Sequence, residues 1–210
     1  MDGLLLDTEK IYYESALACS ERKGYGVSED LILSSMGLNM AATRELFMTK
    51  MGPDFPFDRF FEDVEVLHKE YLQTKGIQKK KGVDELFAYL DEKGIRKSVA
   101  TSTYKDRADM FMELAGISGL FDHIVYGDDL KESKPHPHIY LKAIKAFDFD
   151  KDEILAFEDS NNGILSAYNA GLKVVHIPDL AKISKEAKEK SFIILEDLSQ
   201  AIKLIEQLNS

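Results

Sequence analysis

The sequence has only one cysteine, Cys19, so no disulfide bond can form within the chain. Apolar residues around it recur at helical spacing, and a lone cysteine in such a pattern is more often a buried core thiol than a nucleophile. The absence of disulfides fits a reducing compartment, and we therefore expect a cytoplasmic protein.

Long apolar runs and a surplus of positive charge are also missing. No apolar run approaches the roughly 20 residues that span a bilayer, and the N-terminus lacks the basic and apolar regions of a signal peptide. The formal net charge is −10, whereas binding to a nucleic-acid backbone needs a concentrated positive field. We expect neither a membrane nor a nucleic acid as partner. A small phosphate ester stays open, because a metal ion can reverse the local field.

A chain of 210 residues, of which 44% are apolar, fits one domain or one domain with a smaller insert. From residue 8 to 79 the apolar positions recur every three or four residues, which predicts helices. The lysines at 79–81 are interpreted as a solvated hinge rather than a binding patch. After them, short β-rich runs alternate with helical stretches. The expected strands cover 97–101, 123–126, 154–157, 173–177 and 192–194, and the expected helices cover 82–93, 104–115, 136–146, 161–170 and 197–208. This alternation predicts an α/β fold, with a parallel sheet covered by helices on both faces.

Polar residues of related chemistry come before or directly after the predicted strands. They are Asp2 and Asp7, Thr101 to Thr103, Lys134, and Glu158 with Asp159. Parallel sheets place their ligand sites at the carboxyl ends of the strands, so we expect these side chains to meet at one edge. Together they could hold a phosphate and a divalent cation.

The hydroxyl and lysine segments suit an anion. Thr101 can donate its hydroxyl to a phosphate oxygen. Thr103 and Asp106 have the spacing of a capping box, which predicts a helix N-terminus where backbone N–H groups can bind an anion; alternatively, the hydroxyls only cap the helix. Pro135 fits the first position of a helix and holds Lys134 in a loop, where its ammonium can neutralise a phosphate or carboxylate. The alternative is a solvated surface lysine.

The acidic segment suits a metal. Glu158 and Asp159 follow an apolar strand, where two acids are unfavourable unless they are solvated or paired with a cation. Their hard oxygen atoms suit Mg²⁺, although the pair could instead interact with the dipole of the following helix. His136 and His138 also suggest a metal site. Their i, i+2 spacing would put them on different helix faces, so we interpret them as surface histidines.

Taken in order, these segments resemble the motifs of the haloacid dehalogenase superfamily, in particular the subgroup with β-phosphoglucomutase and pseudouridine-5′-phosphatase. The matching segments are Met1-Asp2-Gly3-Leu4-Leu5-Leu6-Asp7-Thr8-Glu9, Val99-Ala100-Thr101-Ser102, Lys134-Pro135-His136-Pro137, and Phe157-Glu158-Asp159-Ser160 with Asn162-Gly163. The resemblance runs the whole length of the chain. It implies a Rossmann-like α/β core over 1–7 and 80–210, and an inserted helical cap domain over 8–79.

The resemblance also implies a function. It points to a Mg²⁺-dependent phosphatase that hydrolyses a small phosphorylated metabolite, a sugar phosphate or nucleotide-like monophosphate, through an aspartyl-phosphate. Asp2 would act as general acid and base, with its backbone carbonyl facing the metal. Thr101 and the Ser102 amide would bind the phosphoryl group, and Lys134 would stabilise its charge. Glu158 and Asp159 would complete the metal site. The cap would close over the substrate and exclude water.

One part of the first motif is missing. The nucleophilic Asp would occupy the position just before Met1, and the segment from Gly3 to Leu6 is too short for the strand that a parallel sheet normally has before this loop. We expect the nucleophile to lie in residues upstream of Met1. The alternative is a non-catalytic phosphate-binding protein.

The cap differs from that of the mutase, which has a cap arginine shortly after a glycine and a cap histidine near its first helix. Here Gly37 is followed by Leu38-Asn39-Met40, Tyr12 takes the histidine's position, and it stays open whether Arg44 reaches the site. These differences favour a phosphatase over the alternative of a β-phosphoglucomutase-like sugar-phosphate mutase. A dehalogenase fits less well, because the acid pair implies a metal that carbon–halogen cleavage does not need. We expect a monomer.

Overall fold

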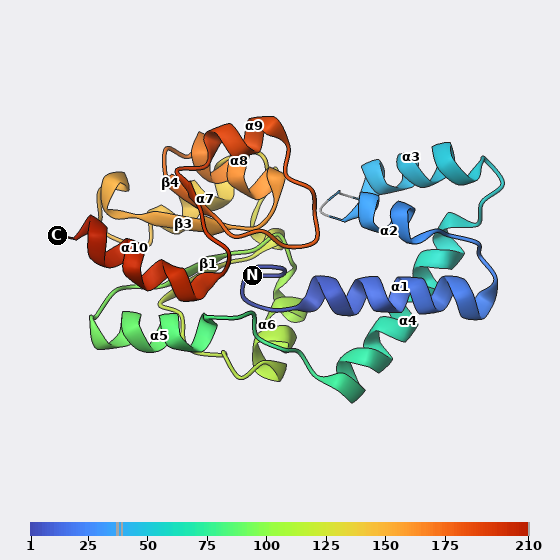
Figure 1. Cartoon of the computed structure of the whole chain (residues 1–210), viewed down its shortest axis with the longest axis horizontal. Coiled ribbons are helices and arrows are strands. Elements are labelled where there is room, and N and C mark those ends of the chain that lie inside the picture. Colours follow the sequence, from blue (N-terminus) through green and yellow to red (C-terminus); the bar gives the residue numbers. More distant parts are fainter. Residues whose placement is uncertain (37, 39, 210) are drawn as a thin grey trace.

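The computed structural model describes residues 1–36, 38 and 40–209. Its first part is a unit of helices, on the right in Figure 1. The unit consists of α1 (Thr8–Lys23), α2 (Glu29–Ser35), α3 (Met40–Met51) and α4 (Phe57–Lys75). The prediction that residues 8–79 are largely helical is therefore confirmed, with the last helix ending at Lys75.

This helical unit has an apolar core of its own. Phenylalanine rings of α3 and α4 pack around Phe47, whose ring centroid lies 5.7 Å from that of Phe60 and 5.6 Å from that of Phe57. Cys19 is buried in the same cluster, as predicted for a core thiol. Because the unit buries its own apolar side chains, it can hold its shape beside the rest of the protein.

The strands of the second part form two parallel sheets. The first consists of β1 (Ser98–Ala100) and β2 (His123–Val125), with Val99 opposite Ile124. The second has the order β3 (Leu155–Glu158), β4 (Lys173–His176) and β5 (Ile193–Ile194), with Ala156 opposite Val174. All the strands predicted from the sequence are present, each within a residue or two of its expected bounds.

Helices cover both faces of the strands (Figure 1). On one face of the strands, an apolar cluster packs them against α5 (Val83–Glu92), α6 (Lys105–Leu114) and α10 (Ala201–Leu208). On the other face, a second cluster packs them against α7 (His138–Ile144), α8 (Asn161–Asn169) and α9 (Lys185–Lys190). Short 3-10 turns cover Gly127–Asp129, Lys151–Glu153 and Leu198–Gln200. The predicted α/β fold with helices on both faces is confirmed.

A cavity separates the two sheets. In the described chain, β1 pairs only with β2, and β3 only with β4. Between β1 and β3 lies a cavity of about 690 Å³, lined mainly by apolar side chains that include Leu4, Leu5 and Val99. Protein interiors contain few voids larger than a water molecule. A space of this size between two strand edges is therefore unusual.

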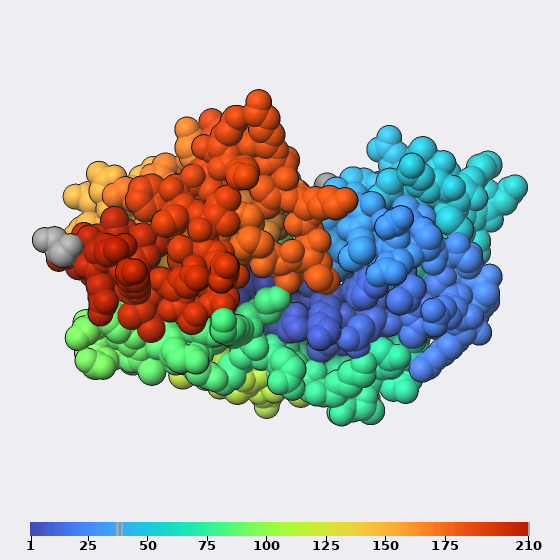
Figure 2. Space-filling view, in the orientation of Figure 1, coloured from blue at the N-terminus to red at the C-terminus, as the bar shows by residue number. Residues whose placement is uncertain are grey.

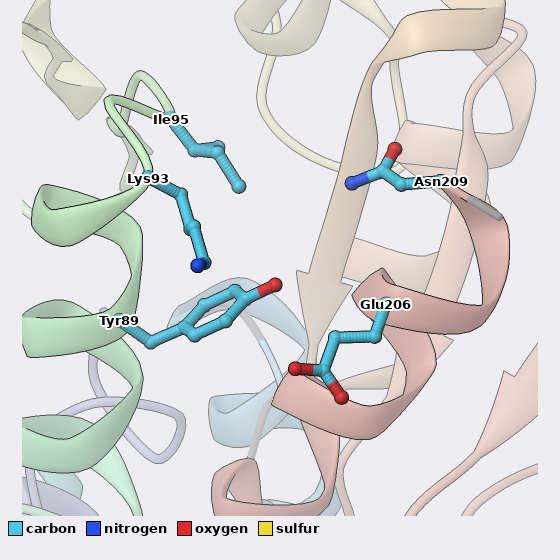
Figure 3. Close-up of a pocket in the computed structure, with 5 residues that line it drawn as sticks. All are labelled: Tyr89, Lys93, Ile95, Glu206 and Asn209. Atoms are coloured by element: carbon cyan, nitrogen blue, oxygen red, sulfur yellow. The ribbon is translucent and has the colours of Figure 1, made fainter.

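The cavity continues toward the end of the core that lies farthest from the helical unit. Figure 3 shows a smaller hollow of about 430 Å³, where Tyr89 and Lys93 at the end of α5 face Glu206 and Asn209 at the end of α10. Ile95 and Asn209 line both spaces. The separation between the two sheets thus extends along the length of the core.

Two local predictions are wrong. Helix α6 begins at Lys105 after Tyr104, and no side chain caps it; the proposed capping box at Thr103 does not form, because the Thr103 hydroxyl donates to Asp2 instead. Pro135 does not open a helix either. The Lys134–Pro135 peptide bond is cis, and α7 begins only at His138.

The N-terminal segment forms no strand of its own. Asp2 and Leu6 form an isolated parallel bridge, and Leu6 forms an antiparallel one with Lys79. The expectation that Gly3 to Leu6 is too short for a strand and turn agrees with this. None of the described helices is long and apolar enough to cross a membrane.

Candidate active site

Asp2 lies at the junction of the helical unit and the core. Its Oδ1 accepts a hydrogen bond of 2.8 Å from the Thr8 hydroxyl, at the start of α1. Its Oδ2 accepts another of 2.8 Å from the Thr103 hydroxyl, in the loop after β1. Two hydroxyl donors from different parts of the chain therefore fix the orientation of this carboxylate. Neither contact was predicted from the sequence.

The loop after β1 brings Thr101 and Ser102 close to the second strand of its sheet. Thr101 is 3% exposed, and its Oγ1 accepts a hydrogen bond of 3.1 Å from the Thr103 backbone N–H. Its hydroxyl proton has no acceptor among the described residues, so it is available to a ligand oxygen. The Ser102 carbonyl packs so closely against Gly127 that a Cβ added there would collide with it. Gly127 thereby sets the path of the loop.

Lys134 connects the ends of β1 and β3. Its ammonium donates to the Ala100 carbonyl over 3.0 Å and forms an ion pair with Glu158. Glu158 is only 4% exposed and also accepts a hydrogen bond from the Tyr140 hydroxyl. Its other oxygen packs against Gly163, where a Cβ would collide with it. Lys134 is therefore held at the sheet edge rather than solvated.

Asp159 lies beside a second aspartate, Asp179, which was not among the predicted site residues. A Cβ built on Gly3 would collide with Asp159 Oδ2 and lie 2.9 Å from Asp179 Oδ2, so the two oxygens converge on this glycine. Asp159 makes no hydrogen bond or ion pair with any described residue. Asp179 Oδ2 is buried and also has no hydrogen-bond partner there. Asp179 follows β4, so the strand-end argument could have found it.

Lys80 provides part of the positive charge at this edge. Its ammonium lies 2.6 Å from Asp179 and 3.3 Å from Asp7. The interpretation of residues 79–81 as a solvated hinge is therefore wrong for Lys80, which forms ion pairs within the acidic cluster. Lys79 and Lys81 form exposed ion pairs with Asp84 and Asp197.

The carboxylates at this edge perturb one another. Burial tends to raise the pKa of Glu158, but the Lys134 ammonium, the chain's N-terminal amino group and the Tyr140 hydroxyl hold that pKa below its usual value. Burial and the Glu158 carboxylate raise the pKa of Asp159. Burial and the surrounding aspartates raise the pKa of Glu9 to about 7. The cluster thus carries more negative charge than its lysines balance.

These residues fit a hard divalent cation. Asp159 and Asp179 present carboxylate oxygens without partners, and oxygen ligands of this kind suit Mg²⁺. Glu158 lies next to them but is already engaged by Lys134 and Tyr140. A cation would remove the repulsion between the carboxylates, which explains how they can share one site.

Contacts from α4 reach the core next to this edge. The Arg107 guanidinium in α6 lies 3.3 Å from Glu65 and 3.1 Å from His68 Nδ1, both in α4. The Tyr12 ring packs edge-on against His68, with ring centroids 5.5 Å apart. His68 is 2% exposed and its Nε2 has no hydrogen-bond partner in the described chain. Tyr12 was among the residues compared with the mutase, whereas His68 was not predicted from the sequence.

Arg44 lies away from the core, in an ion pair with Asp58 and over the Phe57 ring. It therefore does not reach the sheet edge. Gly37 and Asn39, which entered the comparison with the mutase, lie outside the residues that the structure describes.

Comparison with known proteins identifies the family. The model of the haloacid dehalogenase-like hydrolases matches residues 1–177. The chain belongs to this family. Among curated members, it is 28% identical over 207 residues to the "Phosphorylated carbohydrates phosphatase" of Thermotoga maritima, which covers 97% of this chain and 95% of that protein. It is 31% identical to "(DL)-glycerol-3-phosphatase 2" of Arabidopsis thaliana, over 85% of this chain and 77% of that one.

A solved structure of a haloacid dehalogenase-like protein also shares the fold. The protein from Agrobacterium tumefaciens has a TM-score of 0.81 and 19% identity, and the match covers 100% of this chain and 96% of that one. The resemblance that the four motifs indicated is thus confirmed at the level of family and fold.

Proposed function

We propose that this haloacid dehalogenase-like hydrolase is a Mg²⁺-dependent phosphatase of a small phosphorylated metabolite. The observation that carries the proposal is the meeting of Asp2, Thr101, Lys134 and Asp159 at one sheet edge, beside the cavity that Met1 helps to line. The two curated relatives described above are named as phosphatases of a phosphorylated carbohydrate and of glycerol 3-phosphate. Both are small phosphate monoesters.

The nucleophile in this proposal is an Asp immediately before Met1. The Met1 amino group is close enough to help hold the pKa of Glu158 down and to oppose the rise in the pKa of Asp159, so a preceding residue would start beside the acidic cluster. A strand leading to that residue would have β1 and β3 as neighbours and would fill the 690 Å³ cavity between them. A strand that joined the two sheets would provide hydrogen-bond partners for the unpaired backbone N–H and C=O groups of β1 and β3.

The other roles follow from the contacts. Asp2, oriented by Thr8 and Thr103, would protonate the leaving oxygen and later accept a proton from the attacking water. The Thr101 hydroxyl and the Ser102 amide would bind the phosphoryl oxygens. The Lys134 ammonium would stabilise their negative charge, and its pairing with Glu158 keeps it in place. Catalysis of this kind depends mainly on positioning and charge stabilisation.

Asp159, Asp179 and the Asp2 backbone carbonyl would hold the Mg²⁺, with Glu158 beside them. When bound, the cation supplies positive charge that lowers the repulsion between the phosphoryl group and the carboxylates. Helices α1–α4 would form the cap. Figure 2 shows a notch between this unit and the α9 end of the core, which would give a substrate access to the sheet edge.

The proposal can be tested with two extended proteins. In the first, about six β-branched residues followed by an Asp are added before Met1. The second is identical except that Asn replaces this added Asp. We expect the Asp protein to hydrolyse p-nitrophenyl phosphate, glycerol 3-phosphate or a hexose phosphate with Mg²⁺, and to stop in EDTA. The Asn protein should fold equally well and stay inactive. Both should melt higher than the chain that begins at Met1.

Other outcomes would point elsewhere. If both extended proteins fold and melt higher but neither hydrolyses any ester, the protein is a non-catalytic phosphate-binding protein rather than a phosphatase. Turnover that requires a bisphosphorylated sugar would favour a mutase. No described contact favours that alternative, because Arg44 is held by Asp58.

A further inference from the structure

A second group of metal-ligating side chains lies on the segment that leads into α7. Glu132, His136 and His138 each offer one ligand atom, and these three atoms lie within 4.8 Å of one another. The two imidazole rings are neighbours, with centroids 4.0 Å apart. Both histidines lie at the surface, as predicted, with side chains 40% and 48% exposed. The expected reason is wrong, because α7 begins only at His138 and His136 precedes it, so they do not occupy two faces of one helix.

The two glutamate–histidine distances in this group match those of a tetrahedral metal site. Glu132 Oε2 is 3.3 Å from His136 Nε2 and 3.2 Å from His138 Nδ1. With metal–ligand bonds of about 2.0–2.1 Å, two ligands of a tetrahedral Zn²⁺ are about 3.3 Å apart. Both glutamate–histidine separations therefore have the length that a shared cation requires.

The orientation of the His136 ring decides which nitrogen faces the group. Its Nε2 lies at Glu132, whereas its Nδ1 is buried and has no hydrogen-bond partner in the described chain. Nε2 is therefore the nitrogen that would bind a cation, and Nδ1 would then carry the ring proton.

The segment is also held in place from outside the group. The Ser166 hydroxyl in α8 donates to the His136 carbonyl over 2.7 Å, and the Asn169 amide donates to the Pro135 carbonyl over 3.4 Å. Both contacts are independent of the three side chains. The backbone that carries His136 is thus held in place before any cation binds, which lowers the entropic cost of binding.

We propose that Glu132, His136 and His138 form a binding site for a late first-row divalent cation such as Zn²⁺. Two imidazoles and one carboxylate suit Zn²⁺, whereas Mg²⁺ prefers oxygen ligands. Three protein ligands leave a fourth position for water. Lys134 lies between two of the ligands in the chain, so the bound cation fixes the backbone that carries it.

The test measures Zn²⁺ and Mg²⁺ binding by equilibrium dialysis with the folded chain. His136→Ala combined with His138→Ala should weaken Zn²⁺ binding at this site by roughly 100-fold, a loss of about 2.7 kcal/mol. His123→Ala is the matched control and should bind as the wild type does. Asp159→Asn should keep this Zn²⁺ site, because it alters only the acidic cluster. Co²⁺ bound in place of Zn²⁺ should give the visible absorption of a tetrahedral complex.

Either of two results would overturn the site. One is Zn²⁺ binding that survives in the double histidine variant. The other is displacement of Zn²⁺ by an equal concentration of Mg²⁺. Should the double variant unfold, Glu132→Gln gives the same test, since Glu132 is exposed and, among the described residues, forms ion pairs only with the two histidines.

Discussion

The Thr103 hydroxyl donates a hydrogen bond of 2.8 Å to Asp2 Oδ2, across 101 residues of chain. This contact joins the loop after β1 to the N-terminal segment, and Thr8 donates to the other oxygen of the same carboxylate. A carboxylate held by two hydroxyls cannot rotate freely. The proposed acid and base is therefore aimed by its neighbours before substrate arrives.

Replacing Thr103 with Val should slow the extended, active protein about tenfold in kcat, with little change in KM. The reason is the loss of a hydrogen bond to a charged group, worth about 1.5 kcal/mol or more. Thr103→Ser keeps the hydroxyl and should restore most of the rate. Thr74→Val is a control at an exposed threonine whose hydroxyl bonds only to helix carbonyls. A normal kcat in the Thr103→Val protein would show that the Thr103 hydroxyl does not orient Asp2 for catalysis.

Glu158→Gln should destabilise the fold by about 3–5 kcal/mol, because it leaves the Lys134 ammonium buried without its anionic partner. Urea denaturation measures this change. The exposed Lys185–Glu189 pair, 3.8 Å apart, provides the matched control, and Glu189→Gln should change stability little. Equal losses in the two variants would contradict the view that the Lys134–Glu158 pair supports the sheet edge.

His68 should make stability fall in mild acid. Burial and the nearby Arg107 lower the pKa of His68 from 6.5 to about 4. The unfolded chain therefore takes up the proton first, so this stabilisation is complete above pH 6.5 and is lost as the pH falls toward 4. Between pH 7 and pH 5 the loss is about 2 kcal/mol. His68→Gln should flatten the urea-denaturation profile over this range, whereas His123→Gln should leave it as steep as in the wild type.

Gly127→Ala should weaken phosphate binding strongly. Its added Cβ would collide with the Ser102 carbonyl and displace the loop that carries Thr101 and Ser102. Ser102→Ala leaves the backbone in place and should have a mild effect, since the amide is the proposed phosphate ligand. The inhibition constant of inorganic phosphate in the extended protein compares the two. A stronger effect from Ser102→Ala would assign the binding to its hydroxyl instead.

Mg²⁺ should raise the melting temperature of the chain, and Asp159→Asn should abolish that rise. In the absence of Mg²⁺, the same variant should melt slightly higher than the wild type, because it removes one carboxylate from a repelling group. Asp179→Asn should reduce the rise in the same direction. An unchanged response to Mg²⁺ in both variants would place the cation elsewhere.

The fold class and the positions of the helices and strands could be predicted from the sequence, because the patterns that indicate them lie within short segments of the chain. Apolar periodicity placed the helices, and β-rich runs such as that around Val99 placed the strands. The same pattern identified Thr101, Lys134 and Asp159 as strand-end residues. It could also have identified Asp179, which follows β4 in the same way, but a single acid after Pro178 is a weak signal.

What the sequence could not reveal depends on contacts between distant segments. Thr103 has the spacing of a helix cap, but in the folded chain its hydroxyl donates to Asp2 instead of capping α6. Lys80 looks like part of a solvated run until Asp179 comes to lie beside it. His136 and His138 meet because the helix starts two residues later than the spacing suggested. Periodicity carries no information on such pairings.

The open edges of β1 and β3 also bear on how the molecule behaves in concentrated solution. Unpaired strand edges bordering an apolar space readily accept a strand from another chain. A molecule with this cavity open would tend to capture an extended segment of a neighbour, and so to self-associate as its concentration rises. A strand supplied from the same chain would close that route, so filling the cavity would protect the protein against aggregation as well as complete its chemistry.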